Sequence, residues 1–151
     1  MTHQFNQIKE EGFEAIWRKF KTLTRPLIIN LLAVFCIPLV LIIRLIKPWY
    51  WIRFGWIFGS RIGHFAPDVE YYLTERKLGL HPEKANDFYF YRWGKPANIY
   101  FSRLTKRYLF VRGWTEPLFV ANNWLPGGDQ HKILPFVLIR KTRDTDGLFS
   151  Q

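Results

Sequence analysis

The sequence predicts an α/β protein, namely a Rossmann-like partial parallel sheet preceded by an N-terminal membrane-associated helix. Residues 26–43 form an uncharged apolar run near the N-terminus that approaches the ~20 residues a membrane helix needs. Beyond Pro48, short aromatic and β-branched runs alternate with helical stretches, which is the order that builds a parallel sheet. We therefore divide the chain into a basic amphipathic helix over 1–25, an apolar membrane segment over 26–47 and an α/β lobe over 48–151.

The composition favours an ordered chain with an anionic partner. Aromatic residues make up 19% of the chain, which is too many for a disordered protein. The net charge of +10 favours acidic lipid, a phosphorylated ligand or nucleic acid. Because the basic residues are scattered and flank the apolar run instead of forming one stripe, we favour a membrane surface and a phosphorylated ligand over nucleic acid.

The cysteine and histidine pattern gives no support for a metal site. The single cysteine, Cys36, lies inside the apolar run, so no intrachain disulfide is possible. None of the four histidines is spaced to place two ligands on one helix face. We predict neither a metal nor a cofactor.

The two N-terminal segments are predicted to contact the membrane in different ways. Phe13, Ile16, Trp17 and Phe20 recur at helical spacing beside basic residues, as in an amphipathic helix lying on acidic lipid. The apolar segment has Pro38 near its middle and basic residues on both flanks, so charge gives no clear orientation. A bent, re-entrant or in-plane helix with both ends cytoplasmic explains both facts, and a buried core helix is the alternative.

The pattern of the lobe predicts alternating strands and helices. We place strands at 49–54, 87–91 and 108–111 and helices at 66–78 and 97–106 between them. Pro67 is expected in the first turn of the first of these helices, and Gly79 ends it. The remaining predicted elements are a helix at 116–124, a turn at 126–129 and a late strand at 133–139.

The candidate site is the glycine-containing segment 54–65, which joins the first predicted strand to the first predicted helix of the lobe. Ligands of open α/β sheets bind at the carboxyl ends of strands, where glycines let backbone amides approach an anion at a helix N-terminus. Arg61 would clamp a phosphate, and His64 would act as a base or bind a substrate hydroxyl. The substrate-binding candidates in this segment are Gly59, Ser60, Arg61 and Gly63.

A simpler reading of segment 54–65 stays open. The spacing of Gly55, Gly59 and Gly63 is not the dinucleotide fingerprint, and glycine is the ordinary choice in any tight turn. In this reading the glycines are structural and His64 only caps or packs.

Five short motifs resemble those of a bacterial family of glycosyltransferases. They are, in order, Ile-Arg-Phe-Gly (52–55), Arg-Ile-Gly-His-Phe (61–65), Glu-Tyr-Tyr-Leu (70–73), Pro-Ala-Asn (96–98) and Arg-Asp-Thr-Asp-Gly-Leu (143–148). The resemblance covers the front half of longer, two-lobed proteins that work on surface polysaccharide or lipopolysaccharide. It implies that the glycine-containing segment and His64 lie near the acceptor, and it adds Asn98 as a substrate-binding candidate. The family often has a lysine where Ile99 stands here.

The resemblance implies a specific function for the chain. It would be the N-terminal, acceptor-side lobe of a membrane-associated glycosyltransferase B-like enzyme at the cytoplasmic face of the bacterial inner membrane. Sugar would pass from a nucleotide-sugar to a surface polysaccharide or lipid-linked acceptor. The expected partners are acidic membrane lipid, these two substrates and a separate chain supplying the C-terminal lobe, without nucleic acid. A non-enzymatic, membrane-anchored adaptor that uses the lobe as a docking surface is the alternative.

Overall fold

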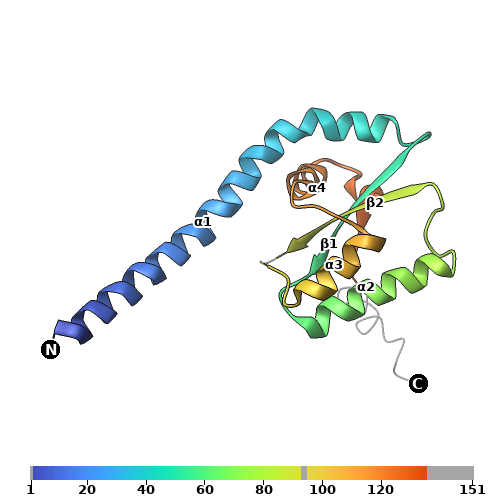
Figure 1. Ribbon diagram of the computed structural model, residues 1–151. Helices are drawn as coiled ribbons and strands as arrows, with labels where there is room; N and C mark the ends of the chain where they lie inside the picture. The colour runs from blue at the N-terminus through green and yellow to red at the C-terminus, as the bar shows by residue number, and fades with distance from the viewer. Residues whose placement is uncertain (1, 93–94, 136–151) are drawn as a thin grey trace, which may run out of the picture.

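The chain begins with one long helix, α1 (Thr2–Leu45), which runs through both the predicted amphipathic helix and the predicted apolar segment. The computed structural model describes residues 2–92 and 95–135, and of 2–19 and 21–23 it describes the backbone alone. Figure 1 shows α1 extending away from the rest of the molecule and then bending over it. Pro26 and Pro38 lie inside α1, and prolines are a usual cause of such bends.

A four-stranded parallel sheet forms the centre of the domain behind α1. Its strands are β1 (Trp51–Phe58), β2 (Ala85–Arg92), β3 (Phe110–Val111) and β4 (Lys132–Ile133), in the spatial order β3-β2-β1-β4. The chain thus reverses its direction of travel across the sheet at β1. This finding confirms the predicted α/β class and its parallel sheet, and the strand order matches the first four strands of the doubly wound order 3-2-1-4-5-6.

Helices cover both faces of the sheet. Figure 1 shows α2 (Ile62–Lys77) and α3 (Ile99–Tyr108) on one face, and α4 (Thr115–Trp124) together with the end of α1 on the other. The 3₁₀-helix η1 (Gly128–His131) leads from α4 into β4. Gly127, before η1, has a φ of 76°, a left-handed conformation that glycine adopts without strain. The predicted turn at 126–129 therefore lies where the chain leaves α4.

Several element boundaries differ from the prediction because tertiary packing decides them. β1 continues to Phe58 instead of ending at 54, since residues 53–57 are all buried between the two helical layers. α2 begins at Ile62 instead of 66, so Pro67 lies inside the helix and not in its first turn. The predicted late strand is paired only at Lys132–Ile133, and its part beyond 135 lies outside the described residues, as does the 143–148 motif.

Each face of the sheet has its own apolar cluster. The cluster under α2 and α3 contains Ile57, Phe65, Val69, Tyr72, Tyr89, Leu109, Val111 and Ile133. The cluster under α1 and α4 contains Ala33, Val40, Ile43, Phe54, Leu118 and Ala121. The end of α1 is therefore part of the core of the domain.

Candidate functional site

The candidate site lies at the carboxyl end of β1, where α2 and α3 both begin. Gly59 follows β1 directly, and its carbonyl oxygen accepts a hydrogen bond of 2.7 Å from the backbone N–H of Ala97. This bond ties the segment before α2 to the segment before α3. Two helix N-termini, whose first backbone N–H groups have no partner within the helix, therefore lie at one edge of the sheet, an arrangement in which α/β proteins bind anions.

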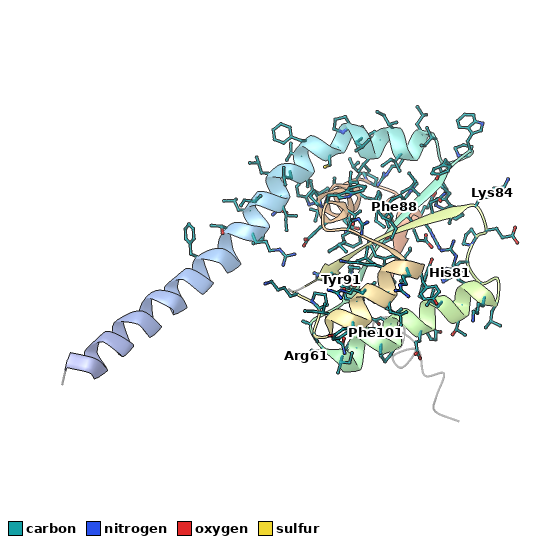
Figure 2. All side chains as sticks on the ribbon, viewed as in Figure 1. Arg61, His81, Lys84, Phe88, Tyr91 and Phe101 are labelled. Carbon is teal, nitrogen blue, oxygen red and sulfur yellow. The ribbon has the colours of Figure 1, made fainter. Side chains whose placement is uncertain are left out.

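An aromatic cluster holds these two helix N-termini in place. The ring of Phe65 on α2 meets the ring of Phe101 on α3 edge to face, with centroids 4.7 Å apart. Phe65 also meets Tyr91 of β2 edge to face, at 5.4 Å. Figure 2 shows Arg61, Tyr91 and Phe101 at this end of the domain. Phe65 is fully buried. The candidate residues therefore lie next to well-packed core side chains.

Gly59 lies too close to β2 to carry a side chain. A Cβ atom at this position would lie 2.8 Å from Cδ1 of Tyr91. The Tyr91 hydroxyl forms a hydrogen bond of 3.0 Å with the Ser102 hydroxyl on α3, which restrains the ring. The close approach of Gly59 to β2 is therefore a packing requirement, whatever ligand binds beside it.

The other two glycines of segment 54–65 do not lie in a loop, and the prediction is wrong there. Gly55 is inside β1, where a Cβ atom would lie 2.7 Å from Cε1 of Tyr89. Gly63 lies in the first turn of α2, and no atom lies within 4 Å of its ideal Cβ position. Between the end of β1 and Arg61, the N-cap residue of α2, the connection consists of Gly59 and Ser60 alone.

Arg61 occupies the N-cap position of α2. Its backbone is extended, with φ −131° and ψ 122°, and its side chain forms no capping hydrogen bond. The Arg61 side chain and the neighbouring Ser60 are exposed at the edge of the sheet. A guanidinium at the start of a helix is well placed to contact a phosphate that the helix N-terminus attracts.

His64 is half-buried in the first turn of α2. The centroid of its ring lies 5.5 Å from that of Phe58, the last residue of β1, with the two planes inclined at 42°. This contact agrees with the packing reading of His64. The role of His64 as a base stays a prediction.

Asn98 caps α3. Its side-chain oxygen Oδ1 accepts a hydrogen bond of 2.9 Å from the backbone N–H of Phe101, which is the usual contact of an N-cap asparagine. The amide oxygen is thus used by the fold, while the Ala97 bond to Gly59 places Asn98 beside the α2 connection. The structure therefore brings Gly59, Ser60, Arg61, Gly63, His64 and Asn98 to one edge of the sheet.

A buried polar network, absent from the sequence-based prediction, lies toward the other end of the same sheet. The Arg53 guanidinium donates to both oxygens of Asp87, with Nε–Oδ1 2.7 Å and Nη2–Oδ2 2.8 Å, and the Tyr72 hydroxyl also donates to Asp87. Burial raises the pKa of Tyr72, as do its hydrogen bond to Asp87 and the Asp87 charge. Burial alone would lower the pKa of Arg53, but the hydrogen bond and the charge of Asp87 raise it. Arg53 and Asp87 are register partners on β1 and β2. Sequence analysis missed their pairing because the sequence does not show which residues of the two strands lie opposite each other.

Tyr89 lies next to this network and is nearly fully buried. Among the side chains that the structure describes, its hydroxyl is the buried polar atom that has no hydrogen-bond partner. Burial raises the pKa of Tyr89 well above its ordinary value, helped by Tyr72 and Asp87. A cavity of about 20 Å³, which is room for about one water molecule, adjoins Tyr89, Tyr72 and Asp68.

A second surface of interest is the apolar segment of α1. One helix in the described part of the chain is long and apolar enough to cross a membrane, and it covers Thr24–Leu45 with a mean hydropathy of 2.8. Only 17% of that window is buried against the domain. Within residues 2–92 and 95–135, no three His, Cys, Asp or Glu side chains gather as metal ligands would. Comparison with known proteins finds no family model, curated protein or solved structure that matches this chain.

Proposed function

We propose that this chain is the acceptor-side lobe of a membrane-associated glycosyltransferase, whose sheet edge binds a phosphorylated, lipid-linked acceptor. The observation that carries the proposal is the Ala97 to Gly59 hydrogen bond, which joins the starts of α2 and α3 beside the exposed Arg61. Two helix N-termini and a guanidinium together favour a ligand with more than one negative charge, such as a diphosphate. The motif resemblance supplies the sugar chemistry.

The proposed reaction is a transfer of a glycosyl group. The acceptor hydroxyl oxygen forms a bond to the anomeric carbon of a nucleotide-sugar, while the bond from that carbon to the phosphate oxygen breaks and a nucleoside diphosphate leaves. His64 takes the proton of the acceptor hydroxyl as general base, because it stands within one turn of Arg61 at the same edge. Arg61 and the helix N-termini hold the acceptor phosphate, and a second lobe supplies most contacts with the nucleotide-sugar.

The apolar surface of α1 supports a location at the membrane. A lipid-linked acceptor stays in the bilayer, so an enzyme that uses it needs its site near the lipid surface. We place the chain at the cytoplasmic face of the bacterial inner membrane, where nucleotide-sugars are made. The excess of Lys and Arg, 22 against 12 acidic residues, favours the acidic lipids of that face.

The test is sugar transfer in bacterial membranes that contain the chain, with added extract of a source cell whose own gene for this chain is deleted, so that the second lobe is supplied without a wild-type background. Radiolabelled nucleotide-sugars are supplied, and label in the lipid fraction is measured for the wild type, H64Q, R61A and the control R107A, whose exposed arginine lies at the far end of α3. We expect H64Q to lower the transfer rate by about 100-fold or more, R61A to lower it by about tenfold, and R107A to leave it unchanged. Transfer that is insensitive to H64Q and R61A would contradict the assigned roles.

A non-enzymatic, membrane-anchored adaptor is the second candidate. The contact of His64 with Phe58 and the capping of α3 by Asn98 favour it, since both side chains serve the fold without a ligand. If the folded chain gives no transfer with any nucleotide-sugar, even when membranes and extract of the source cell are added, the adaptor becomes the better reading.

A further inference from the structure

The apolar part of α1 has two distinct faces. One face packs on the domain through Ala33, Val40 and Ile43, which join Leu118 and Ala121 of α4 in one cluster. The opposite face is exposed along its whole length. Its large apolar side chains are Leu27, Ile28, Leu31, Leu32, Val34, Phe35, Leu39, Leu41, Ile42 and Leu45.

The two charged residues that bound this segment point toward the domain. Arg25 forms an ion pair of 2.8 Å with Glu116 at the start of α4. Arg44 donates to the side chain and backbone of Asn122 near the end of α4. From 26 to 43 the exposed face thus carries no charged side chain, and Asn30 is its one strongly polar residue. Helices that bind along a membrane surface have an apolar face in the lipid and a polar face toward water. In this chain the second face of the helix is covered by the domain instead of being polar.

We propose that α1 lies in the plane of a lipid bilayer with its exposed face in one leaflet, so that the N-terminal part of α1 and the domain lie on the same side. This inference rests on the membrane association of the proposed function but not on sugar transfer. It assigns the exposed face of Leu27–Leu45 to lipid, and it assigns the other face to the domain.

The contacts of α1 with α4 argue against a helix that crosses the bilayer. They begin at Arg25 and end at Arg44, so the whole apolar segment is fastened to the domain. If the docked segment crossed the bilayer, it would carry α4 and the irregular chain on either side of it into hydrocarbon, where exposed irregular backbone is not tolerated. If it separated from the domain instead, Phe54, Leu118 and Ala121 would lose their cover.

Lipid is a better occupant of the exposed face than another protein. Protein interfaces combine an apolar centre with a polar rim, whereas this face carries no charged side chain between residues 26 and 43 and has Asn30 as its one strongly polar residue. The segment Thr24–Leu45 has a mean hydropathy of 2.8. Trp49 and Tyr50, which follow α1, are 79% and 51% exposed. Aromatic side chains of this kind gather at the boundary between headgroups and acyl chains. Basic residues at 18, 19 and 21 add attraction for acidic headgroups.

The first experiment measures binding to vesicles of phosphatidylglycerol and phosphatidylethanolamine. L31E places a charge on the exposed face, where Leu31 is 61% exposed, and L78E is the matched control, since Leu78 is 69% exposed at the end of α2. We expect L31E to lower the partition coefficient of the chain between vesicles and water by at least about tenfold, and L78E to leave it unchanged. Equal binding by L31E and the wild type would overturn the assignment of this face to lipid. So would a dimer in solution that L31E dissociates without any vesicle binding.

The second experiment tests the orientation. In a C36S background, single cysteines are introduced as Q4C in the first turns of α1 and K84C in the exposed connection before β2. A membrane-impermeant maleimide is applied to spheroplasts and to inverted inner-membrane vesicles. Reaction of both cysteines in the same preparation is expected. Reaction from opposite sides would overturn the in-plane orientation alone, whereas a wild-type chain that binds no vesicles would overturn the membrane association of the proposed function.

Discussion

The guanidinium of Arg44 on α1 donates to both the side-chain oxygen and the backbone oxygen of Asn122 on α4, each at 2.9 Å from Nη2. Asn122 is fully buried, and its amide in turn donates to the carbonyl of Gly128 at 2.9 Å. Arg44 also donates to the carbonyl of Pro126. One side chain of the N-terminal helix therefore satisfies backbone carbonyls where the chain leaves α4, which makes the end of α1 part of the domain.

Replacement of Arg44 should loosen the whole α4 corner. R44M removes several charge-assisted hydrogen bonds and leaves the Asn122 oxygen buried without a donor, so we expect the free energy of unfolding to fall by about 2–4 kcal/mol. R44K keeps the charge but lacks the planar fork, and it should lose about half as much. Thermal unfolding in mild detergent, followed by circular dichroism, measures both variants against R107M. An R44K variant as stable as the wild type would mean that charge alone holds this corner.

The two neighbouring tyrosines should respond in opposite ways to loss of their hydroxyl groups. Y72F removes a hydrogen bond to Asp87, the ion-pair partner of Arg53, and should lower the free energy of unfolding by about 1.5–3 kcal/mol. Y89F removes a buried hydroxyl that has no partner among the described side chains, so stability should stay the same or rise by up to about 1 kcal/mol. Denaturant titration of both variants checks the pair. A large loss in Y89F would contradict the assignment of an unpartnered hydroxyl to Tyr89.

Replacement of Gly55 and of Gly63 by alanine should change the free energy of unfolding in different ways, because the first glycine is required by packing and the second lies in an open helical position. G55A brings a Cβ atom to 2.7 Å from the Tyr89 ring and 3.2 Å from Cβ of Ile133, so we expect a loss of about 1–3 kcal/mol. G63A has no atom within 4 Å of its Cβ and lies in the first turn of α2, so stability should be unchanged or rise by up to about 1 kcal/mol. The same titration measures both, and equal losses would contradict the strand position of Gly55.

The stability of the fold should depend on pH through His131. Burial lowers the pKa of His131 below the ordinary value of 6.5, with Lys47 and Arg44 acting in the same direction and a hydrogen bond to the Ile52 carbonyl acting against it. The unfolded chain therefore binds the proton more readily than the folded one. The stability that neutral His131 contributes is complete above about pH 6.5 and falls as the pH drops below that value. Unfolding between pH 5 and 8 should show this loss in the wild type and a smaller one in H131Q.

The sequence predicted the class of the fold and the approximate place of most elements. The helix expected at 116–124 is α4 at Thr115–Trp124, and the strand expected at 87–91 is the centre of β2. These segments have strong local patterns that tertiary contacts reinforce. Gly55 was misplaced because glycine signals a turn locally, whereas here the Tyr89 ring demands a glycine inside β1. Pro67 was expected in the first turn of a helix, but α2 begins earlier, at Ile62, and accommodates the proline in its interior.

The site was predicted as a segment, but its arrangement was not. The sequence marked residues 59–64 and Asn98 separately, and nothing in it indicated the hydrogen bond from Ala97 to Gly59 that brings them together. The bonding of Arg53 to Asp87 was hidden for a similar reason, because it depends on which residues of β1 and β2 face each other. Pairings of this kind are properties of the sheet register and cannot be read from either strand alone.

The contact between α1 and α4 has a consequence for the order of events on the ribosome. The apolar face made by Ala33, Val40 and Ile43 is synthesised long before Leu118 and Ala121, which cover it in the finished domain. The edge of β1 that faces β4 is likewise unpaired until the chain near His131 has been synthesised, because His131 follows its hydrogen-bond partner Ile52 by 79 positions. A nascent chain therefore exposes the whole apolar segment of α1, residues 26–43, before the rest of the domain has been synthesised. We expect the bilayer, or the factors that deliver chains to it, to receive α1 first, and the lobe to fold afterwards against a helix already in place.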